Sequence, residues 1–501
     1  MPLAAPDRKP DYELALDVKN GAKHVATVPC EIWLPAGSND KPLVRFTSRD
    51  RGHSSLIQGP YELDGTIYSF DKKPSVMISA QGVWFQRVSS KFISGTEPPV
   101  ITGVALPEKL IAITSLNSAA SSEQATTYLH FEISENQLLD PIQIIETSYT
   151  GSRKVRTIRT QRIDVYGVGR LRFTRHYHEQ KSQSQPRESI VRDRLVAETR
   201  LSLPAESLIA KDPEIRHLVE ECLLIASFAA RQRTIAPTWH AVDNMHLVKC
   251  FAGNISVPEQ KPEPSIHDVL IDSREFSSFF KGTLKRYGSL PEQARALLRD
   301  ALYRVLPSPN KTLESRYLSL FSALESTILW FRRNADFEYT IPESRSWKAF
   351  SRDVRSLIDS HSAIRDDLRR NMIIDTVGGL RRVPLRHAFF AYCKRFGVQL
   401  DDLWPVFGHA ASLNNIRNKL SHGDTYDRAA FEALMYAEDN HQVLVERMLL
   451  AAFRWPVTRS NVSQAHLKAY GWVADVDLEK HMRMLKNYSG DLDKPSSESS
   501  D

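Results

Sequence analysis

The spacing of apolar residues changes once along this chain, near residue 200, and that change limits the folds available to it. Before this point, short runs rich in β-branched and aromatic residues are separated by proline, glycine and asparagine, as in antiparallel sheets. Examples are residues 31–37, 42–47, 65–70 and 127–133. After it, apolar residues recur every three or four positions, as on one face of a helix. The chain is therefore predicted to be an α+β multidomain protein, β-rich first and α-helical afterwards.

The 501 residues suggest two to four domains. We expect residues 1–200 to form a β-rich domain, a sandwich or an open barrel, as a candidate for sensing or regulation. Residues 201–300 are expected to be mainly helical, and residues 301–456 to form a helical bundle. Residues 457–501 would be a C-terminal extension with a disordered tail.

The bundle prediction rests on amphipathic periodicity. The clearest helix covers Leu313 to Arg333, where Tyr317, Leu320, Phe321 and Leu324 begin a broad apolar stripe. Such successive amphipathic helices with modest loops are typical of a bundle. Further helices are expected at residues 215–229, 292–305, 347–372, 384–397, 409–422 and 428–454.

Composition is that of an ordinary globular protein, with 42% hydrophobic and 25% charged residues. No run approaches the roughly 18 apolar residues that cross a membrane, and the polar N-terminal segment does not resemble a signal peptide. We therefore expect a cytoplasmic protein without a membrane partner. The four cysteines are scattered and form no CxxC pair, which favours neither a disulfide framework nor a zinc knuckle.

Common nucleotide-binding and hydrolase motifs are missing from the sequence. It contains no GxxxxGK[ST], no GxGxxG between strand and helix, no HExxH and no GxSxG. We expect no cofactor. His176 and His178 could be two metal ligands on one strand face, but no third ligand is identifiable in the sequence. Polar positions on a strand edge are the favoured interpretation, so no metal site is predicted.

A basic stretch between Arg153 and Arg175 holds eight basic residues and one acid, Asp164. Arg156 and Arg162 would share one strand face, with Arg159 on the other. These three arginines are candidates for contacting the phosphates of a nucleic acid. A solvated sheet face, or pairing with acids elsewhere, explains the pattern about as well.

The segment from Arg417 to His422, with sequence RNKLSH, stands apart. Glycine usually lies just past the last helical turn, so Gly423 places His422 at a helix C-terminus. The partial negative charge there favours an imidazolium, which suits a group that must give up a proton. Asn418 lies one turn earlier on the same face and could orient the imidazole.

The spacing within this segment also bears on assembly. Arg417 and His422 lie about 140° apart around a regular helix, so one helix does not aim both at one small target. A fraying last turn, or two such helices facing each other across a dimer axis, would bring them together. The chain contains a second Arg-x4-His, Arg382 to His387, which has a proline in its middle. A capping histidine beside a surface arginine is the plain alternative for Arg417 and His422.

These residues resemble a known family. Arg417-Asn-Lys-Leu-Ser-His422 is similar to the RNxxxH motif of HEPN domains, which are all-α bundles and include many metal-independent ribonucleases. The long amphipathic segments 314–333 and 427–454 also resemble helices of that bundle. With a β-rich domain opening on Glu31-Ile-Trp-Leu-Pro-Ala-Gly, the chain resembles ApeA-type anti-phage proteins over most of its length. Some HEPN toxins carry a tyrosine two residues after the histidine, where this chain has Asp424.

The resemblance implies an endoribonuclease acting in abortive infection, with RNA, transfer RNA among it, as substrate. It also implies a homodimer whose two motifs form one composite site, and a phage-derived trigger at the N-terminal domain. Carried over, Arg417 would stabilise negative charge on the phosphate, His422 would be general acid or base, and Asn418 would orient the histidine or a phosphate. Lys419, inside the motif, is a further candidate for nucleic-acid binding.

Two alternatives make different predictions. A non-catalytic HEPN protein would bind nucleotides, RNA or a protein partner without cleavage, and His422→Ala would have little effect. A basic regulator centred on residues 153–175 would show steeply salt-dependent nucleic-acid binding.

Overall fold

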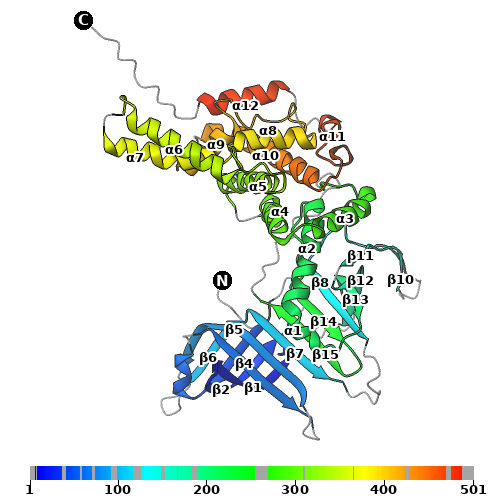
Figure 1. Cartoon of the computed structure of the whole chain (residues 1–501). Coiled ribbons are helices and arrows are strands. Elements are labelled where there is room, and N and C mark those ends of the chain that lie inside the picture. Colours follow the sequence, from blue (N-terminus) through cyan, green and yellow to red (C-terminus); the bar gives the residue numbers. More distant parts are fainter. Residues whose placement is uncertain are drawn as a thin grey trace. The chain divides into compact units, whose positions relative to one another are not determined.

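A computed structural model (Figure 1) describes residues 6, 8–35, 41–56, 59–69, 74–91, 99–116, 126–147, 153–165, 167–181, 189–253, 269–308, 311–364, 366–423, 426, 428–469 and 475–487. Only the backbone is described for residues 87–88, 90, 143–147, 153–156, 159, 177–181, 189–193 and 475–477. Backbone contacts divide the chain into an N-terminal unit, residues 1–227 and 233–263, and a C-terminal unit, residues 228–232 and 264–501. The first contains the strands and the second is helical, which confirms the α+β prediction.

Six strands of the N-terminal unit close into a ring. Its order is β6-β3-β2-β1-β4-β5, and the ring closes because the long strand β5 pairs with both β4 and β6. Phe46 fills the interior and lies over Gly103, where an added Cβ would come within 2.1 Å of the phenyl ring. The strands are β1 (Tyr12–Asn20), β2 (Lys23–Trp33), β3 (Leu43–Ser48), β4 (Tyr61–Tyr68), β5 (Pro74–Lys91) and β6 (Val100–Leu106).

The same sheet extends from β5 in the order β7-β15-β14-β8-β13-β12-β11, with every neighbouring pair antiparallel. A separate two-stranded sheet pairs β9 with β10. These strands are β7 (Lys109–Ser115), β8 (Thr127–Ile133), β9 (Ile142–Thr147), β10 (Arg153–Arg159), β11 (Arg162–Val165), β12 (Gly169–Lys181), β13 (Ser189–Leu201), β14 (Thr238–Val242) and β15 (His246–Ala252).

The extended part of the sheet has one apolar and one polar face, because successive side chains of a strand alternate. Phe131, Phe173 and Trp239 are buried on the apolar side. Helix α2 (Asp212–Ala230) follows α1 (Ser207–Ala210) and lies against the apolar face of the sheet (Figure 1). Its Asp212 accepts a 2.5 Å hydrogen bond from Trp239 Nε1 and lies 2.8 Å from Lys109 Nζ.

Helices α5 and α10 supply much of the core of the C-terminal unit. The predicted apolar stripe of α5 is confirmed, because Tyr317, Leu320, Phe321 and Leu324 are all buried. Thr312 caps its first turn through a hydrogen bond from Ser315 N. The helices are α3 (Ser273–Gly288), α4 (Glu292–Val305), α5 (Leu313–Asn334), α6 (Ser344–Ser360), α7 (Asp367–Val377), α8 (Leu385–Phe396), α9 (Leu413–Ser421), α10 (Phe431–Ala452), α11 (Gln464–Ala469) and α12 (Asp475–Asn487).

Helix α10 also carries buried polar side chains. Arg447 is 1% exposed and makes a bidentate ion pair with Asp402, with nitrogen–oxygen distances of 2.7 and 2.6 Å. His441 is fully buried against Tyr317 and Phe321 of α5, and neither ring nitrogen has a hydrogen-bond partner among the described residues. Burial lowers the pKa of His441 to about 3, so the imidazole is neutral.

Two sequence predictions about regular structure need correction. The single helix expected at 347–372 is two helices, because α6 ends at Ser360 and Asp366 caps the start of α7 by accepting a hydrogen bond from Arg369 N. The hairpin β14–β15 lies within the region 201–300, where mainly helix was expected. Its signal was present, since apolar residues alternate on both sides of the turn at Asp243.

All four cysteines are free and buried. Burial raises the thiol pKa of Cys30 to about 12 and that of Cys393 to about 12, and it also raises those of Cys222 and Cys250. None of the helices in the described part of the chain combines the length and apolar character needed to cross a membrane.

Candidate functional site

Helix α9 carries the RNxxxH segment and is anchored to α5. The Tyr317 hydroxyl donates a 2.9 Å hydrogen bond to the carbonyl of Leu413, the first residue of α9. The expected helix end is confirmed: α9 stops at Ser421, and Gly423 has a φ of +86°. The backbone N–H of His422 donates to the carbonyls of Asn418 and Lys419, both at 3.0 Å. The motif therefore lies in the last turn and cap of a short helix.

The Arg417 side chain is held by three groups. Nη1 donates to Asn418 Oδ1 at 3.2 Å, and Nη2 donates to Glu325 Oε1 at 3.3 Å. The guanidinium carbon lies 5.4 Å from the ring centroid of Phe321. Phe321 and Glu325 are one turn apart on α5, so a single face of that helix orients the arginine. The side chain is still 36% exposed, which leaves its donors accessible to an anion.

His422 presents its side chain to solvent at the C-terminal end of α9. Asn418 connects the two ends of the motif, because its side chain bonds to Arg417 and its carbonyl accepts from the backbone of His422. Its amide thus orients the arginine. Lys419 is half-buried on the same last turn. Asp424 lies outside the described residues.

A tyrosine also lies near this helix. Tyr317 is fully buried, and burial, together with the nearby Tyr426, raises its pKa well above the ordinary value. The phenol is therefore a neutral donor that fixes the start of α9.

The basic stretch 153–175 does not form one strand face. Arg156 and Arg159 belong to β10 in the two-stranded sheet, whereas Arg162 begins β11 in the large sheet. The predicted common face for Arg156 and Arg162 is therefore wrong. The chain changes sheets between them, where Thr160 and Gln161 bond instead to the backbone of Phe173. The side chains of Arg156 and Arg159 lie outside the described residues, and that of Arg162 is exposed.

Arg162 ends a row of polar residues that crosses the large sheet. It lies directly opposite Arg172, and the row continues through directly paired positions on the next strands. Because directly paired residues share one face, these side chains lie next to one another in a line parallel to the hydrogen bonds of the sheet. In order, it consists of Arg162, Arg172, Glu198, His130, His240 and Lys249.

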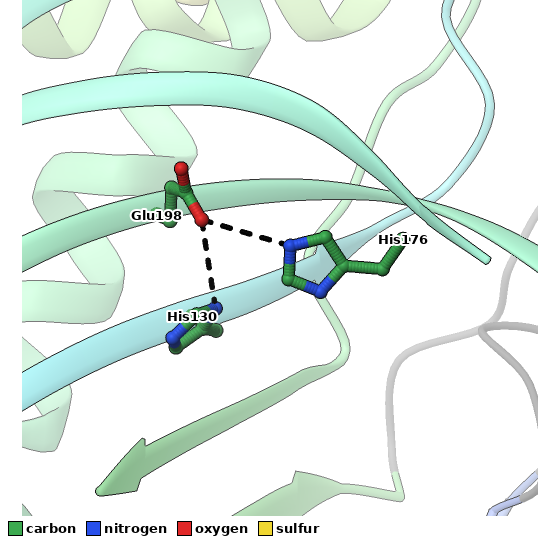
Figure 2. A group of neighbouring side chains, drawn as sticks. All are labelled: His130, His176 and Glu198. Atoms are coloured by element: carbon green, nitrogen blue, oxygen red, sulfur yellow. Dashed lines mark ion pairs between the residues drawn. The ribbon is translucent and has the colours of Figure 1, made fainter. Parts of the chain in front are cut away.

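Two residues of this row lie beside His176. Figure 2 shows that Glu198 faces both His130 and His176, with Oε2 4.0 Å from His130 Nδ1 and 3.6 Å from His176 Nε2. The pKa of His130 is lowered, mainly by burial and then by His176. The sequence does not identify His130 and Glu198 as neighbours of His176, because strand register decides their proximity. The side chain of His178 lies outside the described residues.

No protein-family model, curated protein or solved structure matches this chain.

Proposed function

We propose that the C-terminal unit is a HEPN-type helical bundle and a metal-independent endoribonuclease, acting on RNA in the cytoplasm. The observation that carries this proposal is the placement of Arg417 and His422. Both are solvent-accessible at the end of α9, and Asn418 joins them through hydrogen bonds. A cation that stabilises phosphoryl charge and an imidazole that exchanges a proton are two of the groups that promote phosphodiester cleavage.

The reaction we propose is an internal displacement at phosphorus. The ribose 2′-hydroxyl oxygen attacks the adjacent phosphorus while a neutral imidazole removes the hydroxyl proton. The bond to the 5′ oxygen breaks, and an imidazolium gives that oxygen a proton. The products are a 2′,3′-cyclic phosphate and a 5′-hydroxyl. Arg417 would stabilise the added negative charge on the phosphoryl oxygens.

The two proton transfers favour a dimer. One imidazole must start neutral and the other protonated, and one motif supplies only His422. In a symmetric dimer, His422 of one copy would be the base and His422 of the partner subunit the acid. This arrangement would also remove the angular mismatch between Arg417 and His422 on one helix.

The wider role we propose is anti-phage defence. RNA cleavage, with transfer RNA as one candidate substrate, would cause abortive infection after a phage-derived trigger reaches the N-terminal unit. The support for this part is the order of a β-rich unit before a helical unit, together with the motif.

The test is cleavage of total RNA and transfer RNA in EDTA by the full chain. Wild type should cut, leaving cyclic-phosphate ends, whereas Arg417→Ala and His422→Ala should not. The matched controls are Arg382→Ala and His387→Ala, which alter exposed residues of the other Arg-x4-His pair and should cleave normally. Circular dichroism would verify that each variant is folded. Cleavage that persists in both motif variants would contradict the assignment.

A second experiment applies if the purified wild-type protein does not cleave RNA. Expression of wild type should then be toxic and expression of His422→Ala harmless. Equal tolerance of the two, with RNA binding retained, would favour the non-catalytic binding protein instead. The ion pair of Arg417 with Glu325 is the contact that favours this alternative, since a carboxylate already accepts a hydrogen bond from one nitrogen of the guanidinium.

A further inference from the structure

We propose that His130, His176 and Glu198 form a binding site for a divalent transition-metal ion, with Zn²⁺ as the best fit. The three residues come from β8, β12 and β13 in the N-terminal unit (Figure 2). The site is separate from the Arg417 and His422 pair, whose proposed chemistry uses no metal. The metal-site proposal is therefore independent of the nuclease proposal.

The donor atoms are close to the spacing that zinc requires. Zinc–nitrogen and zinc–oxygen bonds of about 2.0–2.2 Å in a tetrahedron put neighbouring donor atoms about 3.3 Å apart. Glu198 Oε2 lies 3.6 Å from His176 Nε2 and 4.0 Å from His130 Nδ1. All three donor atoms lie within 4.8 Å of one another. Small side-chain rotations would close these gaps without moving the strands.

The sheet register explains why the residues meet. Glu198 on β13 lies directly opposite His130 on β8, so the carboxylate and the imidazole share one face. His176 is on the same face of β12, further along the strand than Arg172, which is the direct partner of Glu198. The His176 ring reaches back toward the carboxylate, and its centroid lies 5.6 Å from that of His130.

The contacts around the cluster leave the donor atoms available. His130 Nδ1 is buried and has no hydrogen-bond partner among the described residues. Arg172 Nη1 lies 3.5 Å from Glu198 Oε1, so Oε2 is the oxygen left to face the two rings. The His240 ring stacks on that of His130 at 4.7 Å and an interplanar angle of 6°. The pairing of Arg172 with Glu198 is the kind of outer contact that orients a ligating carboxylate in known sites.

The ligand set indicates which ion fits and what the site can still accept. Two imidazole nitrogens and one carboxylate suit zinc, whereas calcium and magnesium prefer oxygen donors alone. Three protein ligands leave a fourth zinc position open. The His130 and Glu198 side chains are 17% and 25% exposed, whereas that of His176 is 44% exposed. The open position would therefore lie on the solvent side, where it would take a water molecule.

The test is zinc binding by the full, untagged chain with its cysteines kept reduced. Isothermal titration with ZnCl₂ should show one site per chain. His176→Gln and Glu198→Gln should each weaken it by more than about tenfold. The matched control is His246→Gln, which alters a histidine paired with one carboxylate, Glu206 at 3.1 Å, and should bind normally.

Two further readouts separate lost ligation from lost folding. In EDTA, all four proteins should unfold at similar temperatures, and added zinc should stabilise only wild type and His246→Gln, because binding to the native state alone raises stability. Cobalt(II) bound to wild type should show the intense visible absorption of a four-coordinate ion. The proposal is overturned if wild type binds no zinc, or if both ligand variants bind as tightly as wild type.

Discussion

Arg417 Nη2 lies 3.3 Å from Glu325 Oε1, so the candidate catalytic arginine already has an anionic partner on the neighbouring helix α5. A phosphate that approaches the guanidinium must compete with that carboxylate. Both side chains are more than a third exposed, so the pair is worth at most about 1 kcal/mol. The contact is weak enough for an RNA phosphate to displace.

Glu325→Gln should therefore strengthen RNA binding. Removing the carboxylate charge should lower the Kd for RNA by up to about fivefold, and cleavage in EDTA should become faster. Fluorescence anisotropy would measure the Kd. Glu314→Gln, an exposed acid in the first turn of the same helix, should leave both quantities unchanged. Slower cleavage by Glu325→Gln would mean instead that Glu325 positions Arg417.

His441 should make the C-terminal unit sensitive to acid. Its folded pKa is about 3, and its unfolded pKa is about 6.5, so below pH 6.5 the unfolded chain gains a proton that the folded chain does not. The free energy of unfolding should then fall by about 1.4 kcal/mol per pH unit from this group alone, down to about pH 3. His441→Leu should remove that contribution.

Urea unfolding at several pH values between 7.5 and 4.5 would measure the slope for each protein. His361→Leu, at an exposed position after α6, is the matched control and should keep the wild-type slope. The same slope in His441→Leu would show that the buried imidazole is not responsible.

Arg447→Met should strongly destabilise the C-terminal unit. The change leaves Asp402, which is 12% exposed, without its bidentate partner, and breaking such a buried pair costs about 3–5 kcal/mol. Adding Asp402→Asn should restore part of the loss, because it removes the unpaired charge. Arg352→Met breaks a pair whose side chains are 79% and 71% exposed and should cost less than about 0.5 kcal/mol. Denaturant unfolding would rank the variants.

Arg162→Ala tests whether the polar face of the sheet contacts RNA. Arg162 is exposed and directly opposite another cation, Arg172. If it contacts a phosphate, its loss should weaken binding for all RNA sequences and reduce the slope of log K against log salt by about one. Arg170→Ala should change the slope less, because Arg170 is already paired with Asp164 at 2.8 Å. An unchanged slope for Arg162→Ala would remove this face from consideration.

The features that the sequence predicted well are those encoded locally. Helix α5 begins at Leu313, as its apolar stripe predicts. Helix α9 ends before Gly423, because that position has a positive φ, which glycine adopts without strain. Period and cap residues are both local properties of the chain. The break between α6 and α7 is also local, because Asp366 caps the start of α7, but the apolar period continues across it and predicts one helix.

The features that the sequence could not predict depend on register and on sheet membership. Periodicity places His176 on a face but does not reveal that Glu198 will lie near it, since the β12–β13 and β13–β8 registers decide this. It likewise did not reveal that Arg156 and Arg162 enter different sheets. The contacts of Glu325 and Phe321 with Arg417 depend on the packing of α5 beside α9, which helical periodicity does not specify.

Because every cysteine is buried, each unit contains a thiol that becomes reactive only when that unit opens. Cys30, Cys222 and Cys250 belong to the N-terminal unit and Cys393 to the C-terminal unit. A protected, high-pKa thiol reacts with an alkylating reagent only after the structure around it has opened. The alkylation rate of each cysteine, measured peptide by peptide, would therefore report how often the N-terminal and the C-terminal unit open, separately and in one unmodified protein.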